Sequence, residues 1–557
     1  MRQKLALLRL GDQPLRSLRK DLIAAITVVI MIIPQAMAYA VLAGFPAVYG
    51  LYTCLIPLVL YPFFGSSPYL SVGPVAIISV LLAAGLCRIA EPMTQEYIML
   101  GLFVAFLAGC IQLLLALFRL GSLSNFLSNP VLSGFISAAA IIIIASQLDE
   151  LLGITIERSS SIFGLFRNLF SHIQDSQLVS TIVGVVSIIL ILLIKKIKRS
   201  LPAAMIVVIV MSAVVYFFEL DVLLVGNIPS GLPSLVWPVV MDADVFIKVI
   251  PLAIVIGLVS FVESMAIAKS LGSKHGVYTI SANQELLALG ITKVAGAFFQ
   301  AIPNTASFSR SAINESAGAQ TGWSSIFAAF IVGGSLILFT GLFAYIPYPV
   351  LAAIVIAAVY KLIDYKEIKH LFSHDKSDFG VLVFTLGMTL LAGVQTGIIA
   401  GIMLSIIMLL REVSTPHIAV LGKIDNAGIY RNIERYDEAE VLEEVLIVRY
   451  DDDIFFGNAE HFFQTIKKEL SLRPNTIYLI LDLSAVNHID STGIKKFHQL
   501  IENLHNHRIE IHLSGAKGPL RDRLRKEGII DLLGDDHQNM TIEKSLERIK
   551  YSEGQEA

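Results

Sequence analysis

Long apolar stretches, separated by short polar segments, follow one another up to about residue 410. Marking these stretches predicts about fourteen membrane spans, and several of them fall short of the roughly 20 residues that a full crossing needs. Short spans of this kind are typical of broken membrane helices. The predicted spans lie near residues 22–42, 49–64, 74–86, 98–118, 128–146, 179–194, 202–219, 246–268, 284–300, 307–318, 323–345, 349–360, 379–394 and 396–410.

Basic residues indicate the orientation of these spans. With the N-terminus in the cytoplasm, the basic N-terminal run, Lys195 to Arg199 and Lys361 to Lys376 all face the cytoplasm, as the positive-inside rule expects. Fourteen spans divide into two sets of seven, and an odd number in each half gives the halves opposite orientations. We therefore predict a polytopic α-helical membrane protein with a seven-plus-seven inverted repeat, in which the short third and tenth spans correspond.

The composition agrees with this pattern and adds a second domain. Of the 557 residues, 55% are hydrophobic and 16% are charged, against roughly 25% charged in soluble domains, and the mean hydropathy is +0.71. The charges concentrate near the C-terminus, where apolar β-rich runs alternate with helical patterns. We predict a cytoplasmic N-terminal segment (1–20), a membrane domain (21–412), a linker with a short pairing strand (413–440), a compact cytoplasmic α/β domain (441–552) and a tail (553–557).

The motifs of the chain argue against several classes of protein. Cys54, Cys87 and Cys110 all belong to apolar segments, which favours packing roles over a disulfide framework or a zinc site. The sequence has no GxxxxGK[ST] loop, so it is not that of an ATP-driven pump. We expect no enzymatic activity, no cofactor, no metal and no nucleic-acid partner.

Two interrupted stretches, one in each half of the chain, carry the candidate chemistry. They are SVGPVAIIS from Ser71 and IPNTASFSRSAIN from Ile302, and a helix N-terminus that ends at mid-membrane in each half is typical of a transporter's substrate site. Helix N-termini offer unpaired N–H groups and partial positive charge. Arg310 adds a full charge, which costs roughly 2.5–3.5 kcal/mol at the membrane centre unless it serves a cavity. The pattern favours anion transport; a mere kink at Gly73-Pro74 and a purely structural Arg310 are the alternatives.

Three further polar residues interrupt apolar helices. Gln35 and Tyr39 are four residues apart and so share one helix face, where both can donate a hydrogen bond to an oxyanion or, equally, to a neighbouring helix. Glu263 is a candidate for proton coupling, because taking up a proton cancels one negative charge as the anion enters. Its alternative role is that of a fixed salt-bridge partner for Arg310 or Lys293.

Three motifs that follow one another along the chain resemble those of the SulP permeases, relatives of the animal sulfate/anion exchangers and prestin. The motifs are IPQAMAYAVLAGFPAVYGLYT from Ile33, the SVGPVAIIS segment, and NQELLALGITKVAGAFFQAIPNTASFSRSAINESAGAQT from Asn283. The resemblance covers almost the whole chain. It implies a core domain and a gate domain, an elevator-like motion of the core, a homodimer, and transport of sulfate, bicarbonate, chloride or dicarboxylates. The substrate contacts that it implies are Gln35, Tyr39, Val75, Ala76, Ser307, Phe308, Ser309 and Arg310.

The same resemblance bears on the coupling ion. Glu263 matches the eighth-span glutamate that plant and bacterial relatives link to proton coupling, whereas the sodium-coupled bicarbonate branch tends to have an aspartate-centred site. Two residues depart from the family pattern. Lys293 stands where many relatives have a neutral amide, and Gln320 stands where a basic residue often follows the Ala-Gly-Ala run. Both departures bear on ion specificity, which the resemblance leaves open.

In the C-terminal domain, the stretch DLSAVNHIDSTG resembles the STAS domain that ends SulP proteins. Asp490, Ser491 and Thr492 directly precede a predicted helix, where their side chains suit capping of its N–H groups. The resemblance also associates this loop with nucleotide binding, phosphorylation or contact with a cytoplasmic partner, and makes Ser491 the candidate phospho-acceptor. In transporters the module more often supports folding, trafficking and dimerisation.

Taken together, the sequence predicts a secondary transporter of the cell's inner (plasma) membrane, with both termini in the cytoplasm, that couples sulfate uptake to protons. Bicarbonate or dicarboxylate transport and anion exchange are alternatives within the same class. An anion channel, or an anion sensor that signals through the STAS domain, is the alternative from a different class. The identity of the anion, the coupling mode and the oligomeric state do not follow from the sequence.

Overall fold

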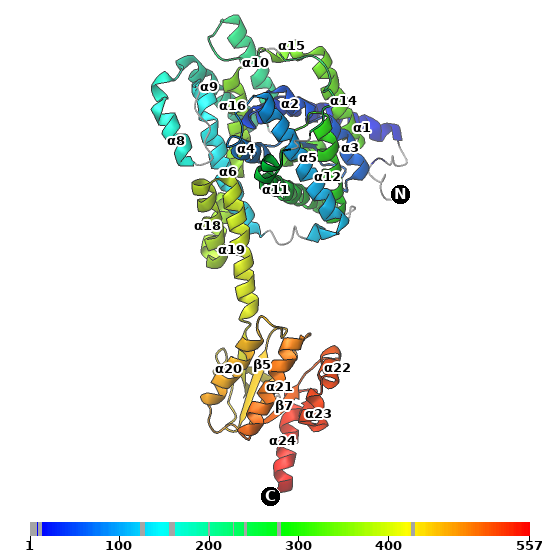
Figure 1. Cartoon of the computed structure of the whole chain (residues 1–557), viewed down its shortest axis with the longest axis vertical. Helices are drawn as coiled ribbons and strands as arrows, with labels where there is room; N and C mark the ends of the chain where they lie inside the picture. Colours follow the sequence, from blue (N-terminus) through cyan, green and yellow to red (C-terminus); the bar gives the residue numbers. More distant parts are fainter. Residues whose placement is uncertain are drawn as a thin grey trace. The chain divides into compact units, whose positions relative to one another are not determined.

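The computed structural model describes residues 8, 14–122, 128–154, 162–198, 201–226, 228–238, 242–275, 280–424 and 429–556. The chain divides into two compact units, Met1–Ser405 and Ile406–Ala557, and each is described by itself (Figure 1). Among the described residues of the chain, seven helices are long and apolar enough to cross a membrane, and four apolar stretches are shorter. The prediction of a polytopic helical protein is therefore confirmed.

The first half of the membrane unit follows the predicted spans. Each span near its expected residues contains a helix, and the third span is the short helix α4, which a two-residue strand precedes. The elements are α1 (Pro14–Leu42), α2 (Val48–Tyr52), α3 (Ile56–Phe64), β1 (Val72–Gly73), α4 (Ala76–Leu86), α5 (Gln95–Leu117), α6 (Asn129–Ser146), α7 (Leu148–Leu152), α8 (Ile162–Ser171), η3 (Ile173–Asp175), α9 (Leu178–Ile197) and α10 (Ala203–Phe217).

The second half repeats this order of elements, with the short helix α13 preceded by the strand β2. The α13 helix begins inside the interrupted stretch that the sequence marked. The elements are α11 (Ala243–His275), α12 (Ala282–Phe298), β2 (Thr305–Ala306), α13 (Phe308–Ser316), α14 (Trp323–Leu338), α15 (Thr340–Phe343), α16 (Tyr348–Val359), η4 (Tyr360–Leu362), α17 (Tyr365–His374), α18 (Lys376–Ala392) and α19 (Val394–Ser414).

Helices of the membrane unit pack in two groups that mix both halves of the chain. In the first group α5 packs on α11 and α12, α3 on α12 and α14, and α1 on α13 and α14; in the second, α6 packs on α18 and α9 on α10 and α16. Close approach within the first group depends on small residues: a Cβ at Gly109 of α5 would lie 2.9 Å from the carbonyl oxygen of Gly290 in α12. We call the first group the core and the second the gate; α1 of the core also contacts α10 and α16 of the gate.

The second unit is a six-stranded sheet with helices around it. The strand order is β4-β3-β5-β6-β7-β8, antiparallel as far as β5 and parallel from there on. Its elements are β3 (Ile418–Ile424), β4 (Ile429–Asn432), β5 (Val445–Tyr450), α20 (Ala459–Ser471), β6 (Tyr478–Asp482), α21 (Ser491–Asn506), β7 (Glu510–Ser514), α22 (Gly518–Lys526), α23 (Ile529–Leu533), η6 (Asp535–His537), β8 (Gln538–Asn539) and α24 (Ile542–Glu556).

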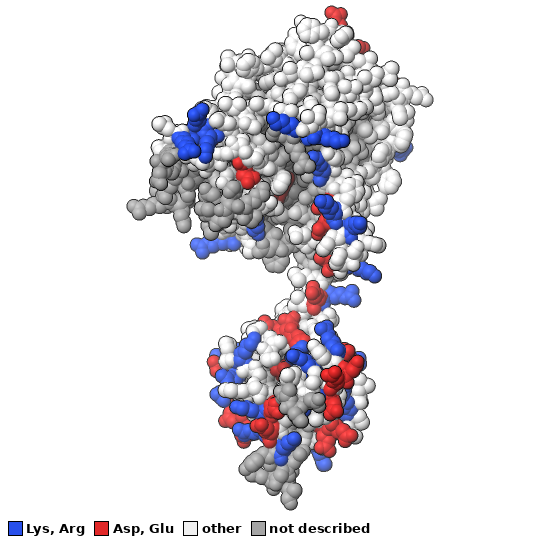
Figure 2. All heavy atoms as spheres, turned by 180° about the vertical axis from the view of Figure 1, so that it is seen from behind, with Lys and Arg blue, Asp and Glu red and all other residues white. Residues whose placement is uncertain are grey.

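Both faces of this sheet are covered by apolar contacts. Leu446, Leu481 and Leu513 belong to the larger core with α20 and α21, whereas Ile447 and Ile480, one residue along their strands, pack on the other face with Ile549 of α24. Residues 413–440, predicted as a linker with a pairing strand, contribute two strands, β3 and β4, to the sheet. Figure 2 shows charged side chains of both signs over this unit and mostly uncharged atoms over the membrane unit.

Candidate functional site

The two interrupted stretches meet inside the core. Strands β1 and β2 pair antiparallel, with Val72 opposite Ala306 and Gly73 opposite Thr305, so the helices that follow them, α4 and α13, both begin next to this pair. Neither N-cap residue, Val75 nor Ser307, makes a side-chain capping hydrogen bond. Two helix N-termini with their partial positive charge therefore start at one place, as the sequence predicted.

Hydrogen bonds between the two stretches fix this arrangement. The backbone N–H of Ser307 donates to the carbonyl oxygen of Ser71 over 3.1 Å, and the N–H of Ser71 donates to the hydroxyl of Ser311 over 3.0 Å. From α11, the hydroxyl of Ser264 accepts a 3.0 Å bond from the N–H of Ala306 and lies 2.7 Å from the hydroxyl of Thr305. The sequence analysis did not single out Ser264, Thr305 or Ser311 as binding residues, although serines within apolar runs are the signal that marks such hydrogen bonds.

Arg310 lies in the first turn of α13 and is 1% exposed. Its Nη1 donates a 2.9 Å hydrogen bond to the carbonyl oxygen of Pro74, directly before α4. Its Nε and Nη2 are buried and have no hydrogen-bond partner among the residues that the structure describes. A Cβ at Gly73 would lie only 3.2 Å from Nη2, so glycine leaves the guanidinium the space that it occupies. Arg310 therefore holds the two stretches together with one nitrogen and keeps two donors for another group.

Gln35 and Tyr39 approach this centre from α1, which contains Pro34. Gln35 is 5% exposed, and its Oε1 is buried without a hydrogen-bond partner among the described residues. Tyr39 is 6% exposed and interacts electrostatically with Arg310 and Glu263. The Oε1 of Gln35 is therefore not used in a hydrogen bond between the described helices, and Tyr39 lies near the group around Arg310.

Glu263 projects from α11 toward the same charges. It interacts electrostatically with Arg310 and Lys293, yet its buried Oε2 has no hydrogen-bond partner in the described parts of the chain. Within the described part of the chain no ion pair of 4.0 Å or less joins Glu263 to either cation. The fixed salt bridge that the sequence offered as an alternative role is therefore not formed in this structure.

Lys293 is fully buried in α12, behind Glu263. Its Nζ donates a 3.1 Å hydrogen bond to Oε1 of Gln112 in α5. The Nε2 of Gln112 in turn donates to the carbonyl oxygen of Gly257 over 2.7 Å and to the hydroxyl of Ser260 over 3.0 Å. Gln112 was not predicted as a site residue, although an amide inside an apolar helix is itself a signal. The result is a buried amino group that Gln112 of α5, itself bonded to α11, holds in place.

A cavity of about 730 Å³ leads from this region between core and gate. Gln35 of α1 and Ser309 of α13 line it on the core side, and Ala204 of α10 and Ile354 of α16 line it on the gate side. Two lysines also line the cavity: Lys195, whose Nζ is 3.4 Å from the carbonyl oxygen of Ala357, and Lys361. This cavity joins polar site residues to basic residues at a helix end, which suits the passage of an anion.

The structure places the predicted contact residues in two environments. Val75 and Ala76 are buried at the start of α4, and Ser307 is buried at the N-cap of α13. Phe308, by contrast, is 57% exposed, and Ser309 is exposed where it lines the cavity. The start of α13 therefore presents its first residues to the open space and Arg310 to the interior.

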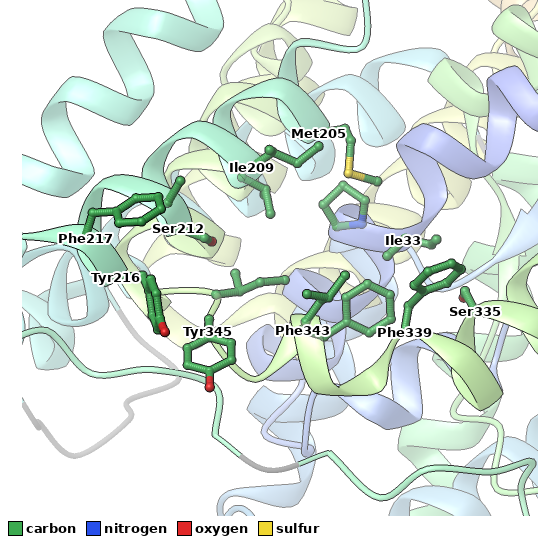
Figure 3. Close-up of a pocket in the computed structure, with 15 residues that line it drawn as sticks. Ile33, Met205, Ile209, Ser212, Tyr216, Phe217, Ser335, Phe339, Phe343 and Tyr345 are labelled. Carbon is green, nitrogen blue, oxygen red and sulfur yellow. The ribbon is translucent and has the colours of Figure 1, made fainter. Parts of the chain in front are cut away.

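A second large cavity, of about 580 Å³, has a different character (Figure 3). It lies among α1, α10, α14 and α15, and Figure 3 shows aromatic and aliphatic side chains such as Phe339, Phe343, Met205 and Ile209 around it. Its polar side chains are confined to groups such as Ser212 and Tyr345. An anion gains little there, so we do not assign the substrate to this cavity.

In the STAS-like unit the loop before α21 has a structural role at Asp490. Its Oδ1 accepts a 2.7 Å bond from the N–H of Gly493, and its Oδ2 accepts a 2.9 Å bond from the N–H of Phe456. Ser491 and Thr492 are exposed. Capping therefore accounts for Asp490, while the two hydroxyl residues are accessible at the surface.

These features define a class: a membrane protein whose two halves repeat one order of elements, with two half-helices meeting at a buried arginine, followed by an α/β unit. The chain belongs to the sulfate permease family, whose model matches residues 18–385, and a STAS domain model matches residues 436–548. The family that the three motifs predicted is confirmed.

Comparison with individual proteins agrees with this assignment. The chain is 36% identical over 533 residues to "Sulfate transporter 4.1, chloroplastic" of Arabidopsis thaliana. The aligned region covers 92% of this chain and 77% of the relative. A solved structure of SLC26A9 has a TM-score of 0.90 at 24% identity, covering 100% of this chain and 93% of that one. The transmembrane domain of the cyanobacterial bicarbonate transporter BicA has a TM-score of 0.61 at 22% identity, covering 70% and 98%. These two structures share the fold of this chain.

Proposed function

We propose that the protein is a secondary active transporter that takes up sulfate together with protons. The observation that carries this proposal is Arg310, whose Nε and Nη2 are buried without protein partners beside the N-termini of α4 and α13. Buried donors on a cation are costly unless an acceptor satisfies them, and a tetrahedral oxyanion offers several acceptor oxygens. The arrangement thus recognises an anion by charge and by hydrogen bonding.

Glu263 supplies the proposed coupling. It shares the site with the cations Arg310 and Lys293, so the uptake of one proton changes the net charge of these three groups from one positive charge to two. A dianion such as sulfate is best balanced by the second state. Release of the proton on the other side of the membrane weakens the hold on the anion, which links the two movements.

Comparison with the relatives supports sulfate as the substrate that we propose for this chain. The relative from Arabidopsis thaliana is named as a sulfate transporter, and it is more similar in sequence than the bicarbonate transporter BicA, with which only the fold is shared. Bicarbonate is the second candidate, because an arginine between two helix N-termini also suits a monovalent oxyanion. Dicarboxylate transport, anion exchange, an anion channel and a sensor that signals through the STAS domain are outcomes that the experiment below separates.

The proposed movement is an elevator-like displacement of the core against the gate. Both groups line the cavity that holds Gln35 and Ser309, so a shift of α1 and α13 relative to α10 and α16 opens or closes it. We propose further that the chain works as a homodimer in the plasma membrane, with both termini in the cytoplasm and the STAS domain available to a cytoplasmic partner. We assign the protein no enzymatic activity.

Uptake of labelled sulfate into proteoliposomes, with and without an imposed inward proton gradient, tests the proposal. We expect saturable uptake that the gradient stimulates in the wild type. In Glu263→Gln we expect uptake without stimulation, because the amide cannot exchange a proton. Glu219→Gln, an exposed carboxylate outside the site, is the matched control and should behave like the wild type.

The other outcomes each point to a different function. Uptake of bicarbonate or a dicarboxylate instead of sulfate would keep the transporter and replace the substrate. Sulfate uptake that needs an anion inside the vesicles and ignores the proton gradient would indicate exchange. Non-saturable flux would indicate a channel. If no anion enters wild-type vesicles, the sensor is favoured and transport is rejected.

A further inference from the structure

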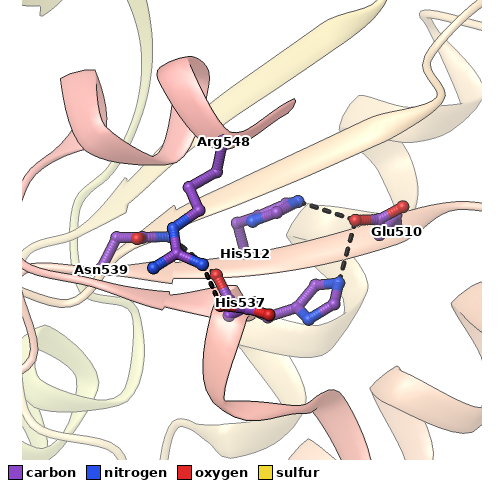
Figure 4. Close-up of polar contacts among 6 residues, drawn as sticks. Glu510, His512, His537, Asn539 and Arg548 are labelled. Atoms are coloured by element: carbon purple, nitrogen blue, oxygen red, sulfur yellow. Dashed lines mark hydrogen bonds and ion pairs between the residues drawn. The ribbon is translucent and has the colours of Figure 1, made fainter. Parts of the chain in front are cut away.

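A cluster of two histidines and a glutamate lies at one edge of the STAS sheet, away from every residue assigned above. Glu510 begins β7, His512 follows two residues later on the same face of that strand, and His537 ends the turn η6 before β8. Figure 4 shows both imidazole rings directed at the carboxylate of Glu510. Two elements of the chain, β7 and η6, thus bring three side chains to one point.

The candidate ligand atoms of this cluster lie close together. Nε2 of His512 lies 3.0 Å and Nε2 of His537 lies 2.9 Å from the same oxygen, Oε1 of Glu510. One ligand atom from each of the three residues lies within 4.8 Å of the others. Zinc bonds of about 2.0–2.1 Å in tetrahedral geometry put neighbouring ligand atoms about 3.3 Å apart, so small movements of these three side chains would bring them around one ion.

The chemistry of the surroundings also suits a cation. His512 is 3% exposed, so its ring lies in the interior beside the carboxylate of Glu510. Neutral imidazole is the form of histidine that binds metals. The nearby positive charge, Arg548, forms an ion pair with Asp536. Glu510 adds a carboxylate oxygen to the two imidazole nitrogens as the third ligand atom.

Packing alone gives a weak account of these histidines. Nδ1 of His512 and Nδ1 of His537 are buried without a hydrogen-bond partner among the described residues, so the packing around each ring leaves one nitrogen unsatisfied. The two rings lie with their centroids 4.7 Å apart, on the strand β7 and beside the two-residue strand β8. A ligand shared by His512 and His537 would therefore fasten the short edge strand and α24 to the rest of the sheet.

We propose that Glu510, His512 and His537 bind a divalent transition-metal ion such as zinc, in a structural site that fastens β8 to β7. Two imidazoles and one carboxylate are a ligand set that suits zinc and related first-row ions. The ion leaves at least one coordination position for water. This site is independent of anion transport by the membrane unit.

Zinc binding to the full-length, detergent-solubilised protein tests the proposal. After chelator treatment, zinc is added and the retained metal is measured by mass spectrometry, with affinity from competition with a chromophoric chelator. We expect about one zinc per wild-type chain, and an affinity at least about tenfold lower in His537→Ala and in Glu510→Gln. Cobalt in place of zinc should give the visible absorption of a nitrogen- and oxygen-ligated site in the wild type and lose it in both variants.

Two controls keep the result specific. His370 and His374 in α17 have ring centroids 4.6 Å apart, so His370→Ala/His374→Ala removes another histidine pair and should leave the retained zinc unchanged. Zinc should also raise the unfolding temperature of the wild type but not of His537→Ala, whose metal-free unfolding temperature reports whether it folds. Equal zinc retention in wild type and His537→Ala, or loss of zinc only in the α17 double variant, overturns the proposal.

Discussion

Nη1 of Arg310 donates a 2.9 Å hydrogen bond to the carbonyl oxygen of Pro74, and this bond ties the first turn of α13 to the residue that leads into α4. One side chain therefore fixes the two half-helices relative to each other, although they come from opposite halves of the chain. The other nitrogens of this side chain lie beside the starts of the same two helices. The contact between the two half-helices therefore depends on the guanidinium to which we assign anion binding.

Arg310→Lys is expected to fail although it keeps the positive charge. The ammonium of lysine is a point charge and cannot bond Pro74 and an oxyanion with a planar fork. Loss of one charge-assisted hydrogen bond costs about 1.5–3 kcal/mol, so the apparent affinity for sulfate should fall by roughly 10- to 150-fold. The measurement is the concentration dependence of proteoliposome uptake; an unchanged affinity would contradict a direct role for the guanidinium.

Gly73→Ala should impair the same site from the opposite side. The added Cβ would lie 3.2 Å from Nη2 of Arg310 and 3.4 Å from Sγ of Cys54, so a guanidinium that Pro74 already holds must move. We expect sulfate uptake to fall several-fold while the protein still purifies as a folded species. Gly334→Ala in α14 is the control, because a Cβ there meets nothing within 4 Å. Equal uptake by both variants would show that the space next to Arg310 is not critical.

Much of this arrangement could be predicted from the sequence because helices that cross a membrane need long apolar runs, which are directly visible in the sequence. Long apolar runs marked the helices, and the polar residues that interrupt them, above all Arg310 and Glu263, are too costly in a membrane to be incidental. The starts of α4 and α13 followed from the same interruptions. Their antiparallel contact through β1 and β2 did not, because each strand has only two residues and no strand pattern of its own.

Other features depend on which residues meet after folding. Gln112 holds Lys293 across 181 positions of sequence, and the pairing of β3 with β5 depends on a register that residues 413–440 do not reveal alone. The Glu510–His537 contact likewise needs β7 and η6 side by side. Such contacts leave no periodic pattern, so sequence reasoning finds the residue types and misses their partners.

Low pH should lower the stability of the folded STAS domain, because Asp451 then becomes protonated. Partial burial raises the pKa of this carboxyl. Hydrogen bonds that it accepts from Arg449, with Nη2 3.0 Å from Oδ2 of Asp451, and from His417 outweigh the effect of burial, so the pKa is lowered overall. A carboxyl with a depressed folded pKa contributes stability that is complete above its unfolded pKa, near 3.9, and is lost as the pH falls through the folded pKa.

The comparison that checks this is thermal unfolding of wild type and Asp451→Asn between pH 7 and pH 3. The variant should unfold at a lower temperature at pH 7, and the difference should shrink below about pH 4 as the wild-type carboxyl becomes protonated. A difference that stays constant down to pH 3 would mean that the loss comes from altered packing rather than from the charge of Asp451.

Lys293→Gln isolates the second buried charge of the membrane site. Glutamine keeps an N–H donor for Oε1 of Gln112, so the hydrogen bond that Lys293 makes now can persist while the charge is lost. When Glu263 is protonated in this variant, Arg310 is the one remaining charge of the three groups. The site then balances one negative charge instead of two, which favours a monovalent anion over sulfate. We expect sulfate uptake to fall about tenfold, equivalent to about 1.4 kcal/mol, with a smaller effect on bicarbonate uptake measured in the same vesicles. Lys248→Gln, which changes an exposed lysine of α11, is the control and should change the uptake of neither anion. Parallel losses of sulfate and bicarbonate uptake in Lys293→Gln would assign Lys293 to the packing of α5 and α12 instead of to selection between anions by charge.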